Sequence, residues 1–322
     1  MHVRILYWTV SLLAFIVMGC VGNSNQEGDL KEKVSMDYAI AYNVLTDSQN
    51  DNYEVFTMNL DGSGKRNITN SSGVEWTYFS HQDRVYFISD KDTCRRCFFL
   101  YCTNYQGREI KKISNIRLAD SWMSAHDSVL IVVPYRSIDS AFYIIGLSGD
   151  ILVSLYTGLP YSADPLFVND GRQIVFRGGL TKSKLIEGFN EALYIIGRDG
   201  KNRKQLTHYP PSDTTATKFD YLAGTPRLHP IEGFISYQSF QKGKYSLFAV
   251  SLDGSKQWKL TENSENEGWH DWSQDGKWLA IELFDADQTQ FHIGLMNWKT
   301  RELNILTDTT YQYQQSPNFV LK

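Results

Sequence analysis

The 322-residue sequence has little proline, little cysteine and no excess of positive charge. Its 8 prolines, its 14% of aromatic residues and the absence of low-complexity tracts are the reverse of a disordered composition, so a disordered chain is excluded. A formal net charge of −4 leaves no basic stripe that would indicate a nucleic-acid partner. The abundant Tyr, Phe and Trp residues instead suit half-buried β-strands.

An apolar run near the N-terminus, Ile5–Met18, is too short for a membrane-spanning helix of about 20 residues and fits a secretory signal. It ends in Val17-Met-Gly-Cys20, which resembles the bacterial lipobox. We therefore predict that residues 1–19 are a lipoprotein signal peptide and that Cys20 is lipidated. Acyl chains would then anchor the protein, at about 0.8 kcal/mol for each buried methylene. The alternative is an ordinary signal peptide followed by an incidental cysteine.

The rest of the chain divides into two parts. Residues 20–36 are polar and unpatterned, and they read as the lipid anchor and a flexible tether. Residues 37–322 carry the aromatic and apolar segments and are predicted to form one folded domain. An exported, lipid-anchored protein of this kind is expected at the bacterial cell envelope, on the periplasmic or surface side of the outer membrane.

Three further cysteines are Cys94, Cys97 and Cys102. Structural zinc is not favoured, because a Cys-x-x-Cys zinc site needs a second such pair. In an exported protein one structural disulfide is the favoured use, with Cys94 and Cys97 as a possible pair. Free thiols and redox chemistry are the alternatives, and the sequence does not decide which two cysteines pair.

A turn signal recurs along the chain at intervals of 42 to 54 residues, which is the period of propeller blades. Before each turn stands an alternating apolar strand, such as Ser246–Val250, and after it a shorter strand that often ends in Leu-Thr or Ile-Thr. Glycine supplies the positive φ that such hairpin turns require. The turn glycines are Gly62, Gly107, Gly149, Gly200 and Gly254, with a degenerate sixth copy at Trp298–Thr300.

The second half of each repeat is another hairpin, and its clearest copy is Trp272–Ile281. Proline stands two residues before the leading hydrophobic residue at Pro165, Pro226 and Pro317, where we expect the first residue of a strand. This succession resembles the TolB-type propeller repeat over residues 38–322. The resemblance implies an all-β, six-bladed propeller with four antiparallel strands per blade. We expect no counterpart of the N-terminal domain of TolB proteins, because only 17 residues separate Cys20 from Tyr38.

The two ends of the folded domain are predicted to close the ring. Ser316–Leu321 has the pattern of an innermost strand without a hairpin partner, and Tyr38–Asn43 has the pattern of that partner. We therefore expect the C-terminal strand to join a blade whose other three strands come from residues 38–69. Such closure removes the exposed edges that an open sheet has to protect.

Propellers usually bind at the mouth of the central funnel, where the innermost strands begin. Trp76 and Trp269 could stack on a sugar or clamp a peptide there, and Glu75, Asp120 and Asp164 could make the mouth acidic. The alternative is that the tryptophans pack between blades and the acids are solvated. The complete set of candidate funnel residues is Glu75, Trp76, Asp120, Asp164, Thr225, Trp269, His270 and Gln315.

His270 is the one histidine that the repeat places at the funnel, whereas His81, His126 and His229 fall near hairpin turns and are expected to face solvent. A catalytic metal needs about three converging ligands, so no metal site or cofactor is predicted. Nucleophile-elbow and phosphate-loop motifs are lacking. We therefore favour a non-enzymatic, monomeric envelope protein that binds a protein or glycan at the funnel. The alternative is a carbohydrate-active lyase or hydrolase centred on His270.

Overall fold

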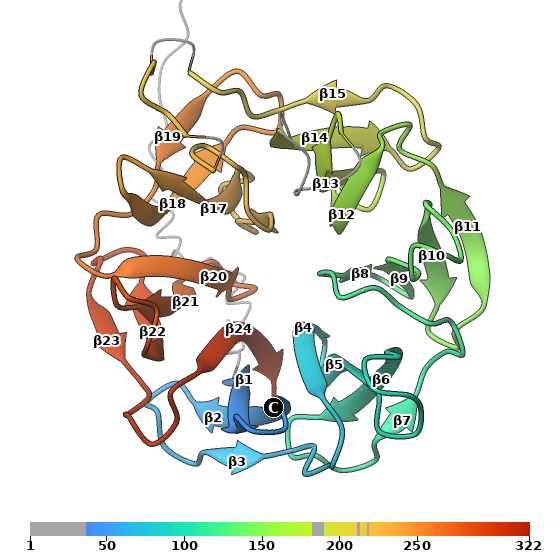
Figure 1. Ribbon diagram of the computed structural model, residues 1–322, viewed down its shortest axis with the longest axis vertical. Helices are drawn as coiled ribbons and strands as arrows, with labels where there is room; N and C mark the ends of the chain where they lie inside the picture. Colours follow the sequence, from blue (N-terminus) through green and yellow to red (C-terminus); the bar gives the residue numbers. More distant parts are fainter. Residues whose placement is uncertain (1–36, 182–189, 211–212, 218) are drawn as a thin grey trace, which may run out of the picture. The chain divides into compact units, whose positions relative to one another are not determined.

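The computed structural model describes residues 37–181, 190–210, 213–217 and 219–322. These residues form six four-stranded antiparallel sheets, which stand around a common centre as the blades of a β-propeller (Figure 1). The predicted all-β, six-bladed fold is therefore confirmed. In the described part of the chain, no helix is long and apolar enough to cross a membrane. The predicted signal peptide, Cys20 and the tether lie outside the described residues.

Each blade uses four strands in order from the centre of the ring outward. The innermost strands of blades 1 to 6 are β24 (Gln314–Leu321), β4 (Glu75–His81), β8 (Ser124–His126), β12 (Tyr161–Val168), β16 (Arg227–Leu228) and β20 (Asn266–Trp272). The second strands are β1 (Tyr38–Asp47), β5 (Arg84–Ser89), β9 (Val129–Val132), β13 (Gln173–Gly179), β17 (Ile235–Gln241) and β21 (Trp278–Phe284). The third strands are β2 (Asn52–Asn59), β6 (Phe99–Asn104), β10 (Phe142–Gly146), β14 (Glu191–Gly197), β18 (Lys244–Val250) and β22 (Phe291–Asn297). The outer strands are β3 (Arg66–Asn67), β7 (Lys111–Lys112), β11 (Ile151–Leu155), β15 (Lys204–Gln205), β19 (Gln257–Lys259) and β23 (Leu303–Ile305).

The hydrophobic core lies between blades. In the described chain there are six buried clusters, and each joins two neighbouring blades around the ring. Between blades 3 and 4, for example, Phe142 of β10 meets Phe176 of β13 edge to face, with ring centroids 5.6 Å apart. Burial of these apolar faces stabilises the ring by roughly 25 cal/mol per Å². Each blade therefore depends on both of its neighbours.

The Leu-Thr pairs of the repeat have a structural role. In four blades the threonine hydroxyl accepts a hydrogen bond from the backbone N–H of a residue fourteen positions earlier, which lies in the third strand. This bond follows directly after the last backbone hydrogen bond between the third and outer strands. It thus helps to satisfy a backbone donor of the blade, and in blade 5 the amide of Leu247 is shared with the carboxylate of Glu267 at 3.0 Å. The pairs and their distances are Thr69 with Val55 (3.0 Å), Thr207 with Leu193 (2.9 Å), Thr261 with Leu247 (3.3 Å) and Thr307 with Ile293 (2.9 Å).

The turn glycines sit against the preceding blade as well as in a turn. Gly149 has a φ of +92°, and a Cβ atom there would overlap the carbonyl oxygen of Ile113 in the neighbouring blade. In the sixth copy, where glycine is missing, Arg301 adopts the positive φ of 64°. At Gly62, Gly107 and Gly149 a side chain would therefore meet the backbone of the preceding blade, in addition to the strain of the positive φ.

Replacement of Gly149 by alanine is expected to lower the free energy of unfolding by more than the roughly 1–3 kcal/mol of a strained dihedral alone. Gly243→Ala is the matched control, because Gly243 has a φ of +80° and open space around the position of its missing Cβ. Urea unfolding of both variants measures the two costs. An equal loss in the two variants would contradict the contact with Ile113.

The ring closes as predicted. β24 pairs antiparallel with β1, from Tyr38 opposite Leu321 to Val44 opposite Gln314, and β1 continues into β2 and β3. The C-terminal strand is thus the innermost strand of blade 1, and residues 38–69 provide the other three (Figure 1). Both ends of the folded domain are held in one sheet.

Four of the inner strands carry an irregularity within the strand. The register shifts within β4, β12 and β20, and again where β1 meets β24. Pro165 and Pro317 lie at two of these bulges inside their strands, so the predicted position at the first residue of a strand is wrong for them. A bulge tolerates proline because it interrupts the ladder of hydrogen bonds. Such bulges also re-aim side chains.

Of the cysteines in the described residues, Cys94 and Cys97 form a disulfide, whereas Cys102 is free and buried. The possible pair named from the sequence is therefore the pair that forms. The disulfide closes the loop between β5 and β6 on the cavity side of blade 2.

Candidate functional site

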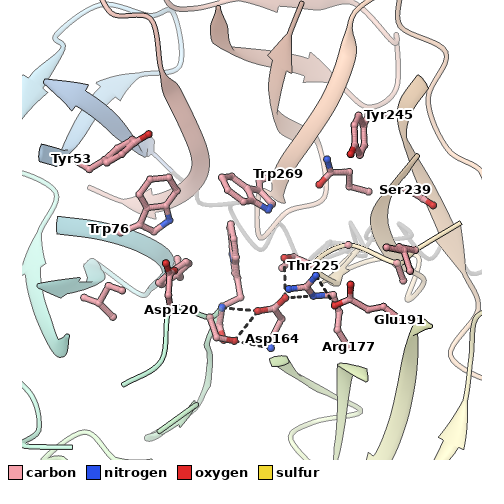
Figure 2. Close-up of a pocket in the computed structure, with 18 of the residues that line it drawn as sticks. Tyr53, Trp76, Asp120, Asp164, Arg177, Glu191, Thr225, Ser239, Tyr245 and Trp269 are labelled. Atoms are coloured by element: carbon pink, nitrogen blue, oxygen red, sulfur yellow. Dashed lines mark hydrogen bonds and ion pairs between the residues drawn. The ribbon is translucent and has the colours of Figure 1, made fainter. Parts of the chain in front are cut away.

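A cavity of about 590 Å³ opens at the centre of the ring (Figure 2). Its described lining comes from the inner ends of the blades and from loops beside them. Five of the predicted funnel residues line it: Trp76, Asp120, Asp164, Thr225 and Trp269. In the aligned repeats these five occupy the same position, three residues before the leading hydrophobic residue. One repeat position thus supplies a large part of the wall.

The other three predicted funnel residues, Glu75, His270 and Gln315, are not part of the lining, so their predicted placement is wrong. Each is adjacent in sequence to the lining position. Neighbouring residues of a strand point to opposite faces, so an error of one residue turns a side chain away from the cavity.

Glu75 shows where such a side chain goes. It is fully buried, and its Oε1 accepts hydrogen bonds from Ser71 (2.8 Å) and Ser89 (2.6 Å). Burial raises the pKa of Glu75 to about 7. Gln315 is also buried, with 8% of its surface exposed, and it accepts a long hydrogen bond from the Tyr53 hydroxyl at 3.4 Å. Both side chains serve the framework around the cavity.

His270 is enclosed between blades 5 and 6. Its Nε2 lies 2.7 Å from the hydroxyl of Ser236, and the residue is 3% exposed. Burial, and then the nearby charge of Arg227, lower the pKa of His270 to about 3, so the ring is neutral at physiological pH. Among the residues that the structure describes, no group of three or more His, Cys, Asp or Glu side chains could hold a metal ion.

His229 also differs from the prediction that it faces solvent. It is 2% exposed, and its ring lies 4.4 Å from that of Trp272 and 4.8 Å from that of Phe234, measured between centroids. Burial lowers its pKa. Its position near a hairpin turn was read correctly, but the turn packs against the neighbouring blade.

One wall of the cavity is aromatic. Trp76 of β4 and Trp269 of β20 meet edge to face with centroids 5.7 Å apart, and Trp122 lies 4.8 Å from Trp269. Tyr53 and Tyr78 extend this wall, with centroids 4.7 Å from Trp76 and 4.8 Å from Trp122, respectively. Trp76 and Trp269 are only partly buried, so they offer ring surface to a ligand.

The opposite wall is polar (Figure 2). Arg177 of β13 lies between two carboxylates: its Nε contacts Asp164, and its Nη1 is 2.9 Å from Glu191 of β14. Asp164 also accepts hydrogen bonds from the Ser121 hydroxyl (2.8 Å) and the Trp122 amide (2.9 Å). We call Asp164, Arg177 and Glu191 the charged triad.

Burial shapes the electrostatics of the charged triad. Asp164 and Glu191 are almost fully buried, and the side chain of Arg177 is 17% exposed. Burial acts to raise the pKa of Asp164, but Arg177 and the hydrogen bonds from Ser121 and Trp122 hold it below its ordinary value. Burial likewise acts to lower the pKa of Arg177, and the two carboxylates raise it instead. Asp164 and Arg177 are therefore ionised at neutral pH, and the triad presents fixed hydrogen-bonding groups at the wall.

Arg227 ties the inner strands together. From β16 in blade 5 it donates to the carbonyl of His270 in blade 6 and to the carbonyl of Tyr78 in blade 2, each at 3.1 Å. Its guanidinium also lies 5.2 Å from the ring of Trp122. Blades 2 and 5 face each other in the ring, so this one side chain bridges its centre and fixes the aromatic wall from a second direction.

The rim of the cavity in blade 2 is held by the disulfide loop. Arg96, between Cys94 and Cys97, pairs with Asp51, and both residues line the cavity. The amide of Arg96 donates to Asp90, which fixes the loop against the blade. Both described arginines of the lining, Arg96 and Arg177, are thus engaged with carboxylates.

Sequence reasoning missed the lining residues that lie outside the inner repeat position. Tyr78 and Trp122 occupy one other repeat position, just before the leading hydrophobic residue, and a second comparison of the copies could have found them. Tyr53, Arg177 and Glu191 lie on second and third strands, where no repeated polar signal marks them. Whether these residues line the cavity depends on how far each strand extends toward the centre of the ring.

Comparison with known proteins shows the fold alone. No protein-family model and no curated protein matches the sequence. Among solved structures, a protein described as TolB from Agrobacterium tumefaciens is 15% identical (TM-score 0.56), with 85% of this chain and 90% of that chain covered. A chain of a nidogen/laminin complex is 10% identical (TM-score 0.61), with 88% and 98% covered. A chain of Kuenenia stuttgartiensis hydrazine synthase is 12% identical (TM-score 0.66), with 89% and 47% covered. The chain therefore has a TolB-like six-bladed β-propeller fold.

Proposed function

We propose that this protein is a binding protein of the bacterial cell envelope that captures a glycan in the central cavity. The observation that carries the proposal is the division of the cavity into an aromatic wall and a hydrogen-bonding wall. A pyranose ring has an apolar face that stacks on aromatic rings and hydroxyl groups that pair with carboxylates, amides and guanidinium groups. Both kinds of surface face the same space here (Figure 2).

The envelope location rests on the sequence. The apolar run that ends at Cys20 supports export and lipid anchoring, and residues 20–36 would let the propeller reach away from the membrane. The TolB-like fold is compatible with this assignment. Mass spectrometry of Cys20 in the mature protein would test lipidation directly.

Catalysis at His270 is not part of the proposal. The enzyme alternative required a histidine at the funnel, and His270 instead lies buried beside Ser236. Its pKa of about 3 is also far below that of a general base suited to neutral pH. The geometry of the cavity therefore supports binding through stacking and hydrogen bonds.

Loss of either partly buried tryptophan is expected to weaken sugar binding at least tenfold. Trp76→Ala and Trp269→Ala each remove ring surface from the aromatic wall, and tryptophans that a ligand covers commonly dominate the binding energy. Isothermal titration with neutral, amine-bearing and uronic trisaccharides measures the effect. Trp258→Ala is the matched control, because Trp258 is a partly buried tryptophan of β19 outside the cavity.

Thermal unfolding of each variant establishes that the ring is intact before binding is compared. If no trisaccharide binds the unmodified protein, the glycan proposal is wrong. Unchanged affinity in both cavity variants would place the bound sugar elsewhere on the molecule. A crosslinked pull-down from native envelope would then identify a protein partner, which is the other occupant that the funnel could accept.

A further inference from the structure

The described lining of the cavity has an unbalanced charge. It includes four carboxylates, Asp51, Asp120, Asp164 and Glu191, and two guanidinium groups, those of Arg96 and Arg177, which gives a formal charge of −2. Arg96 is paired with Asp51, and Arg177 with two carboxylates. Neither arginine is available to neutralise an anionic ligand without leaving a carboxylate of the framework unpaired.

Of the four lining carboxylates, Asp120 is the one with which neither Arg96 nor Arg177 forms an ion pair. It is exposed, and the Tyr78 hydroxyl donates to its Oδ1. Among the described residues no Lys, Arg or His side chain forms an ion pair with it. Burial, and then the charge of Asp120, raise the pKa of Tyr78 well above its ordinary value, so the hydroxyl remains a neutral donor. Asp120 therefore presents its carboxylate at the cavity, held in place by the Tyr78 hydroxyl.

The surroundings of Asp120 favour an organic cation. Its partner Tyr78 is part of the aromatic wall, with its ring 4.8 Å from that of Trp122 and 6.4 Å from that of Trp76. Aromatic faces attract cations, tryptophan most strongly. The wall already holds one cation in this way, since the guanidinium of Arg227 lies 5.2 Å from the ring of Trp122. A carboxylate and tryptophan faces together are the groups that recognise an ammonium.

We propose that the glycan captured in the cavity carries a free amine, as in an N-unsubstituted amino sugar, and that Asp120 binds its ammonium. This proposal rests on the proposed function and adds the chemical class of the ligand. The sugar ring lies against Trp76 and Trp269, its hydroxyl groups face the charged triad, and its ammonium meets Asp120 at the edge of the aromatic wall. The same charge disfavours polyuronates, whose carboxylates would meet an acidic cavity.

The test compares three trisaccharides by isothermal titration near pH 6, where the sugar amine is protonated: a β-1,4-linked glucosamine trimer, its N-acetylated form and a galacturonic acid trimer. The unmodified protein is expected to bind the amine form about tenfold more tightly than the acetylated form, and the uronic form most weakly. Asp120→Asn is expected to lower the affinity for the amine form to that for the acetylated form. Asp127→Asn, which removes a carboxylate in the β8–β9 turn outside the cavity, is expected to change neither affinity.

The outcomes separate this inference from the proposed function. Equal affinity of the unmodified protein for the amine and acetylated forms would overturn the role of Asp120 and leave glycan binding standing. A preference for the amine that survives in Asp120→Asn would do the same. Failure of all three sugars to bind would overturn both proposals.

Discussion

A chain that ends at Gln315 is expected to lose cooperative thermal unfolding. Removal of residues 316–322 takes most of β24 out of blade 1 and exposes β1, whose first seven residues are all buried. Phe319 and Val320, 6% and 1% exposed, are lost from the packing against the neighbouring blades. Replacing a single buried Phe by Ala costs about 3–5 kcal/mol, and a whole domain has about 5–15 kcal/mol of stability.

The same deletion removes a hydrogen bond from each of two carboxylates of blade 6. The carboxylate of Asp271 accepts the amide of Phe319 at 2.9 Å, and that of Glu282 accepts the amide of Ser316 at 3.0 Å. Differential scanning calorimetry of the truncated protein, with a deletion of Lys322 alone as control, measures the effect. A truncated protein that melts like the intact one would show that the ring does not depend on this closure.

The fold could be predicted from the sequence because the repeat consists of residues with strict backbone requirements. Gly62, Gly107 and Gly254 all adopt the positive φ that the hairpin turns demand, and Thr207 and Thr261 satisfy equivalent amides in successive blades. Every blade needs the same turns and the same hydrogen bonds, so the same residue types recur once per blade along the sequence. Closure of the ring could be predicted in a similar way, because each end of the folded domain has the pattern of a strand that lacks a partner.

The candidate site was predicted only in part, because a placement that is wrong by one residue turns the side chain away from the cavity. Trp269 lines the cavity, whereas its neighbour His270 faces the interior between blades. Neighbouring residues of a strand point to opposite faces, and the register shift between Glu267 and His270 hides from the sequence which of the two points to the cavity. Arg177 was invisible for another reason: its role depends on Asp164 and Glu191, which lie on two other strands and become its neighbours only in the folded blade.

Replacement of Arg177 by methionine is expected to lower the free energy of unfolding by about 3–5 kcal/mol at neutral pH. The change keeps much of the side-chain volume but leaves Asp164 and Glu191, which are 2% and 1% exposed, without the guanidinium between them. Buried carboxylates that lose their counter-charge are strongly destabilising, because desolvation is no longer offset. Urea unfolding at pH 7 measures the loss.

The pH dependence distinguishes lost charge pairing from lost packing. In the unmodified protein the pKa of Asp164 is lowered, so its contribution is present above the ordinary pKa of an aspartate and is lost as the pH falls through the lowered value. In Arg177→Met the charge of Arg177 is gone, and we expect burial to outweigh the remaining hydrogen bonds from Ser121 and Trp122 and to raise that pKa, so the deficit is largest at neutral pH and shrinks toward pH 5. The triple variant Arg177→Met, Asp164→Asn, Glu191→Gln removes all three charges and is expected to recover most of the stability, since Asn tolerates the φ of 52° at position 164. A deficit that is constant with pH and persists in the triple variant would mean that Arg177 acts through packing alone.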